Sequence, residues 1–129
     1  GALIEAVVVA QCADGLTELE AGGARLVVPR VPQPAGARLR LRVAAHDVIL
    51  SRGRPEGLSA LNLLPGTVVA IRAGEGPGAL VSLDTPAGGL LARVTLRSVE
   101  ALGLAPGLAC WAVIKTVAIA PGDVSGAVP

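Results

Sequence analysis

Two hydroxyl side chains, Thr95 and Ser98, stand three residues apart at the start of a segment with helical spacing. Lys115 and Thr116 follow on a segment with the pattern of a strand. The first turn of a helix leaves backbone N–H groups without partners and carries a partial positive charge, so it favours anions. Two hydroxyls at such a terminus, together with one ammonium group, can hold a small tetrahedral anion. Hydrogen bonds to charged groups contribute about 1.5–3 kcal/mol each.

The same residues also have purely structural interpretations. Thr95 can cap the helix, Ser98 can face solvent, and Lys115 can lie along an edge strand with its ammonium group in water. Spacing alone favours these structural interpretations over an anion site.

The composition predicts a small all-β protein. Of the 129 residues, 52% are hydrophobic but only 1% are aromatic, so small aliphatic side chains must fill the core. The 17 glycines and 10 prolines require short elements separated by turns. The net charge of +1 provides no strong field for nucleic acid or membrane lipid, and the apolar runs are far shorter than the roughly 20 residues of a membrane span. We therefore expect no nucleic-acid partner and no membrane insertion.

Catalytic and metal-binding signatures are absent from the sequence. Cys12 and Cys110 lack the spacing of metal ligands and are interpreted as reduced thiols of a cytoplasmic protein. His46, the only histidine, lies beside Asp47 and is interpreted as structural. The Gly-x-x-x-x-Gly-Lys-Ser/Thr loop that cradles nucleotide phosphates is missing. We expect neither an enzyme nor a cofactor. Because the chain starts at Gly1 without methionine, it is interpreted as a fragment of a longer protein.

Runs of β-branched and aliphatic residues mark the expected strands. The clearest alternation follows residue 38, where three arginines share one face and Leu39, Leu41 and Val43 share the other. A short helix is expected over residues 96–102, with Thr95 as its N-cap and Gly103 at its end. We expect strands over residues 3–10, 16–19, 25–28, 38–50, 67–71, 80–84, 90–95 and 109–119.

The polar, Gly/Pro-rich segment 51–57 is predicted to separate two units. Gly22-Gly23 in the first unit and Gly88-Gly89 in the second are predicted to form corresponding hairpin turns, which is the pattern of an internal repeat. Short strands with one helix before the last strand are typical of a Greek-key barrel of the OB type. We therefore predict an all-β fold of two tandem five-stranded OB-like barrels that can exchange strands. The first barrel covers residues 1–54, the second covers 58–120 and contains the short helix, and residues 121–129 form a flexible tail.

Four ordered motifs carry a resemblance to a known family. They are Ser-Ala-Leu-Asn-Leu-Leu-Pro-Gly at 59–66, Leu-Ala-Arg-Val-Thr-Leu-Arg-Ser at 91–98, Leu-Gly-Leu at 102–104 and Val-Ile-Lys-Thr at 113–116. In this order they resemble the molybdate-binding Mop family, also called TOBE domains. The nearest likeness is to the C-terminal regulatory region of the ATP-binding subunit of molybdate ABC transporters.

The resemblance implies tandem barrels that form a homodimer and bind molybdate or tungstate at barrel or subunit interfaces. One position departs from the family, because many members have arginine where this chain has Leu61. The first barrel also lacks the Thr-x-x-Ser helix, so a full site is not expected there. The implied donors are the side chains of Ser59, Thr95, Ser98, Lys115 and Thr116 and the main-chain N–H groups near Ala60 and Leu61.

Two functions remain open at this stage. In the first, the chain senses the oxyanion in the cytoplasm, or at the inner face of the membrane through the subunits of an ABC transporter that it regulates. In the second, it is a structural dimerisation domain whose anion site has degenerated, which the leucine at position 61 favours. The sequence does not distinguish molybdate from tungstate, because the two anions have nearly the same size, charge and shape.

Overall fold

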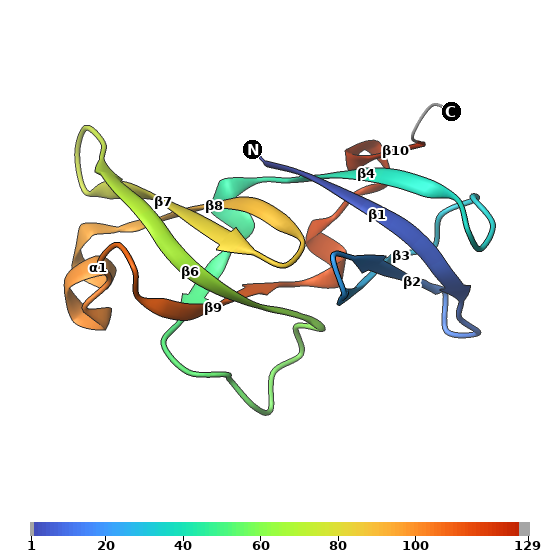
Figure 1. Ribbon diagram of the computed structural model, residues 1–129, viewed down its shortest axis with the longest axis horizontal. Coiled ribbons are helices and arrows are strands. Elements are labelled where there is room, and N and C mark those ends of the chain that lie inside the picture. The colour runs from blue at the N-terminus through green and yellow to red at the C-terminus, as the bar shows by residue number, and fades with distance from the viewer. Residues whose placement is uncertain (1, 127–129) are drawn as a thin grey trace.

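A computed structural model describes residues 2–126 and shows two five-stranded antiparallel sheets side by side (Figure 1). The strand order is β10-β4-β1-β2-β3 in the first sheet and β5-β9-β6-β7-β8 in the second. The curled sheets confirm the all-β prediction of tandem OB-like units. The strands are β1 (Ala2–Gln11), β2 (Leu16–Ala21), β3 (Ala24–Pro29), β4 (Arg38–Val43), β5 (Ile49–Ser51), β6 (Asn62–Ala73), β7 (Gly78–Thr85), β8 (Gly88–Thr95), β9 (Ala109–Ile114) and β10 (Val124–Gly126).

The two sheets exchange strands. β5 precedes the Gly/Pro-rich segment 51–57 but pairs with β9, in the register Ile49↔Val113. β10 follows the second sheet but returns to the first, where Val124 lies opposite Leu41 of β4. Residues 121–126 therefore form a 3-10 turn and a paired strand where a flexible tail was predicted, while 127–129 lie outside the described residues. The predicted boundary between the two units, at residues 54–58, remains a prediction. Strand pairing joins the two units across it, through β5 on one side and β10 on the other.

Two predicted strands are shorter than expected. The strand that begins at Arg38 ends at Val43, because a 3-10 helix, Ala45–Asp47 (η1), follows it. The Asp47 N–H donates a hydrogen bond to the Ala44 carbonyl at 3.0 Å and closes this turn. The last long strand ends at Ile114, and a second 3-10 helix, Thr116–Ala118 (η2), follows it. In both places a local turn replaces the ladder that alternation alone predicted.

The β7–β8 turn is at Pro86-Ala87 rather than at the predicted Gly88-Gly89. Gly88 pairs with Thr85 as the first residue of β8. The Thr85 hydroxyl holds the turn, because it donates to the Gly88 carbonyl at 2.7 Å and accepts from the Ala87 N–H at 3.1 Å. A threonine side chain therefore closes the turn that glycine flexibility was expected to form.

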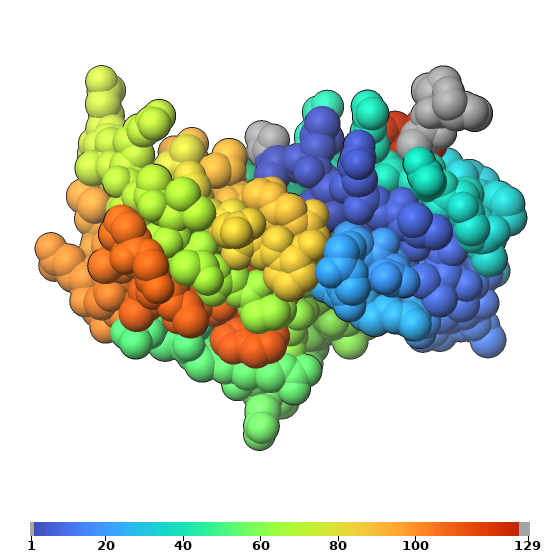
Figure 2. Space-filling view, in the orientation of Figure 1, coloured from blue at the N-terminus to red at the C-terminus, as the bar shows by residue number. Residues whose placement is uncertain are grey.

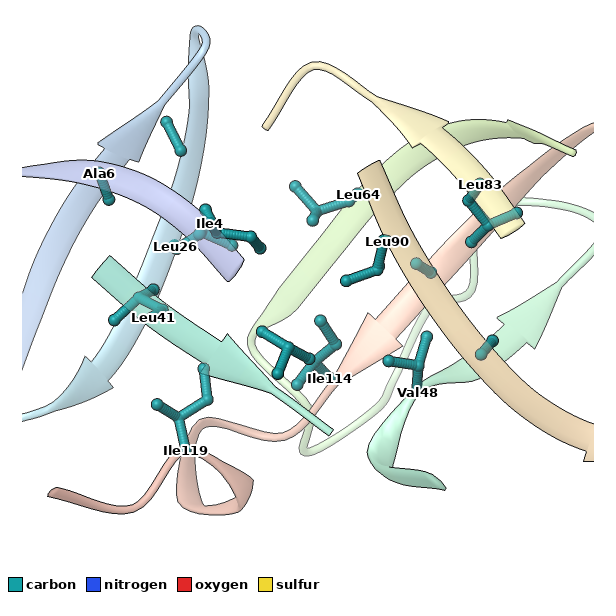
Figure 3. Close-up of a cluster of buried hydrophobic side chains, with 14 of the residues drawn as sticks. Ile4, Ala6, Leu26, Leu41, Val48, Leu64, Leu83, Leu90, Ile114 and Ile119 are labelled. Atoms are coloured by element: carbon teal, nitrogen blue, oxygen red, sulfur yellow. The ribbon is translucent and has the colours of Figure 1, made fainter. Parts of the chain in front are cut away.

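One apolar core runs through both sheets. Its buried side chains are aliphatic apart from one cysteine, as the composition predicts, and they include Ile4 and Leu41 from the first sheet and Leu64 and Leu90 from the second. Figure 3 shows the labelled side chains of the two sheets directed into a shared interior. Ile119 extends this core after the second sheet has ended. The shared core makes the two units one packed body.

The hairpin turns of the two sheets meet at the middle of the molecule, where Figure 2 shows the β2–β3 turn against the β7–β8 turn. Gly22 has a φ of +57° and lies so close to Pro86 that a Cβ atom at this position would overlap the Pro86 carbonyl oxygen. Only glycine fits both the backbone conformation and the space.

Candidate functional site

The seven predicted site residues lie in two groups at opposite ends of the second sheet. β6 and β9 are antiparallel with Asn62 opposite Ile114, so the loop before Asn62 lies beside the residues after Ile114. Thr95 pairs with Gly78, which lies near the other end of β6. Measured along β6 from Asn62, at about 3.3 Å per residue, that end is roughly 35 Å away. We name the first group the loop–lysine junction; it consists of Ser59, Ala60, Leu61, Lys115 and Thr116. The second group is Thr95 and Ser98.

Exposed donors surround the loop–lysine junction. Ser59 and Lys115 are both exposed, and Lys115 precedes η2 in an extended conformation. Leu61 is 53% exposed and immediately precedes Asn62, the residue that pairs with Ile114. The junction therefore presents one hydroxyl and one ammonium group to solvent beside an irregular loop, whose backbone N–H groups lie outside the sheet ladder.

The hydroxyl of Thr116 is already used inside the protein. It donates to the carbonyl oxygen of Val27 on β3 at 2.9 Å, and Thr116 is 6% exposed. Asn62 is fully buried and bonds the same residue twice: its Oδ1 accepts from the Val27 N–H at 2.7 Å and its Nδ2 donates to the Val27 carbonyl at 3.0 Å. Sequence reasoning missed this contact, because the two residues are 35 positions apart in the chain and no local pattern marks the pair.

The second group forms a helix cap. α1 (Leu96–Leu102) is a seven-residue helix that begins after Thr95, as predicted. The Thr95 Oγ1 accepts from the Ser98 N–H at 3.1 Å and donates to the Ser98 Oγ at 3.0 Å. The structural interpretation of Thr95 therefore holds, and Ser98 keeps a hydroxyl proton to donate. Gly103 ends the helix in the left-handed conformation, with a φ of 62°.

Arg52 holds the other end of α1. Its Nη1 donates to the Leu102 carbonyl at 2.6 Å, at the terminus where the helix dipole favours a positive charge. We expect Arg52→Gln to lower the free energy of unfolding by about 1 kcal/mol, because one charged, exposed hydrogen bond is lost. Urea unfolding measures the change. Arg72→Gln, which changes another exposed arginine, on β6, is the control and should have little effect.

A cleft of about 570 Å³ opens beside the loop–lysine junction, between the β2–β3 turn and the outer face of β6 and β9. The Arg54 guanidinium lies 5.5 Å from the ring centre of Trp111, a cation–π distance. Arg25 is ion-paired with Glu18 at 3.2 Å, whereas Arg54 has no ion-pair partner within residues 2–126. The cleft is therefore positively charged. It is lined by Gly22, Gly23, Ala24, Arg25, Arg54, Leu61, Leu63, Pro65, Pro86 and Trp111.

The cysteines do not form a metal centre in the described part of the chain. Burial raises the pKa of the Cys110 thiol, and desolvation together with Glu18 and Asp14 raises the pKa of the Cys12 thiol. Both thiols are thus protonated near neutral pH. No cluster of three or more metal-ligating side chains occurs within residues 2–126. Over the same range, no helix is long and apolar enough to cross a membrane.

Comparison with known proteins gives consistent matches. Residues 58–121 match the family of TOBE domains. The chain is 42% identical over 115 residues to a molybdenum import ATP-binding protein, ModC, of Mesorhizobium japonicum, covering 89% of this chain and 31% of that protein. It is 49% identical over 108 residues to ModC of Albidiferax ferrireducens, covering 83% and 29% respectively.

A solved structure matches the whole fold. The cytoplasmic molybdate-binding protein ModG, in a crystal form with molybdate bound, superposes with a TM-score of 0.79 at 29% identity, covering 99% of this chain and 96% of that one. The present chain spans about a third of the length of the two ModC relatives. The matched TOBE residues contain both groups of the candidate site.

Proposed function

The chain belongs to the TOBE family, and from this premise we propose that it is a binding module for molybdate or tungstate. The observation that carries the proposal is the loop–lysine junction, where an exposed lysine and the irregular loop that contains an exposed serine lie at the adjoining ends of β9 and β6. Four such hydrogen bonds, less the cost of ordering, are sufficient for the roughly −8 kcal/mol of micromolar affinity. No cofactor and no catalytic group is part of this proposal.

We assign the donors as follows. The Ser59 hydroxyl, the Lys115 ammonium and the backbone N–H groups of Ala60 and Leu61 contact the oxyanion directly. Thr116 contributes its position rather than its hydroxyl, because that hydroxyl bonds Val27.

Thr95 and Ser98 enter the site through a second copy of the chain. They lie at the opposite end of β6 from Lys115, so one copy does not bring all the donors to a single anion. In a homodimer with the anion at the subunit interface, the Ser98 hydroxyl of one copy completes the donor set of the other. The exposed apolar side chains near the junction, Leu58, Leu61 and Val117, supply apolar contact area for this dimer.

In the cell, we place this module in the cytoplasm, as a regulatory part of a molybdate ABC transporter. An anion bound between two copies stabilises the one arrangement of subunits in which the site is complete. By binding that arrangement more tightly than others, the oxyanion shifts the transporter toward a regulated state.

The second candidate function is a structural dimerisation domain with a degenerate anion site. The exposed leucine at position 61 favours it, because an apolar side chain at the junction adds contact area and no charge. This function predicts a stable dimer whose melting temperature is independent of molybdate.

Isothermal titration calorimetry with molybdate, and sulfate as the control anion, separates the two functions. We expect saturable micromolar binding of molybdate with little heat from sulfate. Lys115→Ala should weaken molybdate binding about tenfold, because one charge-assisted hydrogen bond is lost. Arg42→Ala, which removes an exposed positive charge from β4 of the first sheet, away from both groups of donors, should bind as wild type does.

Unchanged affinity in Lys115→Ala would remove this lysine from the site. A folded dimer that binds neither anion would exclude the oxyanion-binding function and leave only the structural dimerisation function. Light scattering gives the oligomeric state in the same samples. Trp111, the only aromatic residue, lines the cleft that Leu61 shares, so its fluorescence provides an independent titration signal.

A further inference from the structure

Three side-chain hydrogen bonds from the second sheet and its C-terminal extension converge on a single residue of the first sheet, Val27. Asn62 engages both its N–H and its carbonyl, at 2.7 and 3.0 Å, and Thr116 adds a second bond to the carbonyl at 2.9 Å. Within residues 2–126, these are the only side-chain hydrogen bonds that join these two parts of the protein. We call this set of three residues the Val27 clamp.

The clamp completes an open edge of the first sheet. β3 is the last strand of that sheet, and Val27 lies opposite Glu18 of β2. In an antiparallel pair, alternate residues direct both their N–H and carbonyl groups away from the partner strand. Val27 is such a residue, and the carboxamide of Asn62 takes the place of a neighbouring strand. Because Asn62 is fully buried, water does not compete for these bonds.

The clamp residues are the immediate neighbours of the proposed oxyanion donors. Asn62 follows the loop that ends at Leu61, and Thr116 follows Lys115. The two segments that would contact the anion are thus fixed, one residue away, to the same backbone group on β3. A displacement of β3 would move the loop and the lysine together, or would break the clamp and separate them.

We propose that Asn62 and Thr116 are positioning residues of the oxyanion site and that the Val27 clamp couples its occupancy to the first sheet. This inference rests on the proposed function. The clamp gives the otherwise unassigned first unit a role: its β3 holds the loop before Asn62 and the segment around Lys115 in place relative to each other. By thermodynamic reciprocity, an anion that binds only when the clamp is closed also suppresses opening of the clamp.

Amide hydrogen exchange, followed by NMR with and without molybdate, tests the coupling. Opening of the clamp frees the Val27 N–H for exchange. If the anion binds only the closed state, molybdate at about 100 times its Kd slows this exchange by up to about 100-fold. The Gly36 N–H, which bonds the Val8 carbonyl at 2.8 Å elsewhere in the first unit, is the control amide and should slow much less. Sulfate at the same concentration should change neither rate.

Substitutions at Thr116 provide a second, independent measurement. Thr116→Val removes the hydroxyl but keeps the shape, and Val27 keeps both bonds to Asn62, so the protein should still fold. We expect its molybdate affinity to fall about tenfold and the protection of Val27 by molybdate to shrink with it. Thr116→Ser restores the hydroxyl and should restore both the affinity and the protection.

The outcomes separate this inference from the function on which it rests. If the wild type binds molybdate and the Val27 and Gly36 amides gain equal protection, the clamp is structural only and the coupling is wrong. Equal affinity of Thr116→Val and wild type would overturn it in the same way. If the folded wild type does not bind molybdate in the calorimeter, the proposed function and the coupling fail together.

Discussion

Replacing Gly22 with alanine is expected to lower the free energy of unfolding by about 2–4 kcal/mol. The new methyl group would overlap the backbone carbonyl oxygen of Pro86, so one of the two tight turns would have to shift. Overpacking typically costs about 1–3 kcal/mol, and the left-handed backbone at this position adds about 1–2 kcal/mol for a residue with a Cβ atom. A less flexible unfolded chain recovers about 0.4–1 kcal/mol of this loss.

Gly23→Ala is the matched control for this substitution. Gly23 is the next residue of the same turn and also has a positive φ, of 87°, but a Cβ atom there meets nothing within 4 Å. Urea unfolding of the two variants therefore separates backbone strain from the contact between the sheets. Equal destabilisation of both would show that strain alone accounts for the loss and that the Gly22–Pro86 contact contributes nothing.

Local signals were sufficient for the helix and for most strands. Thr95 and Gly103 bound α1 in the structure as they do in the sequence, because capping depends on residues only a few positions apart. The period-two alternation from Arg38 to Val43 likewise reports which face is buried, without reference to any partner strand. The 3-10 turns at Ala45–Asp47 and Thr116–Ala118 were missed, because the flanking residues continue an apolar, strand-like pattern through them.

Strand exchange depends on partners that are distant in the chain. β5 and β10 have three residues each, too few to show a period, and each pairs across the boundary between the units. A segment of this length receives its structure from the edge that it joins. The repeat pattern in the sequence allowed for exchange of strands between the barrels but did not identify these strands.

For the candidate site too, features set by neighbouring residues could be predicted from the sequence, whereas contacts between distant residues could not. The ordered motifs predicted Lys115 and the loop at 59–61 as site residues, and the antiparallel register of β6 and β9 places these two segments side by side. The partner of Asn62 is Val27, 35 residues earlier in the chain, and nothing near either residue marks the contact. For the same reason Thr116 was predicted to contact the anion, whereas its hydroxyl faces β3.

Asn62→Ala is expected to lower the free energy of unfolding by about 2–4 kcal/mol. The half-buried Val27 N–H would lose the partner that the fully buried Asn62 supplies, which costs about 1–3 kcal/mol, and the missing carboxamide would leave a small cavity. The Val27 carbonyl would keep its bond to Thr116, which limits the loss. Chemical denaturation at neutral pH measures the change. A loss below about 0.5 kcal/mol would show that water or a shifted strand replaces the amide.

Asn62→Asp tests the same two hydrogen bonds to Val27 through the pH dependence of the free energy of unfolding. A protonated carboxyl has the shape of the carboxamide and reproduces both of its bonds to Val27, whereas the carboxylate would be buried and would face the Val27 carbonyl oxygen. Burial therefore raises the pKa of the introduced carboxyl in the folded state above its unfolded value of about 3.9. Its stabilising contribution is present below that value and is lost as the pH rises through the folded-state pKa, by about 1.4 kcal/mol for each pH unit that separates the folded and unfolded pKa values. Relative to wild type, we expect near-equal stability at about pH 4 and a deficit at pH 7, because only the neutral side chain both donates to and accepts from the edge of β3.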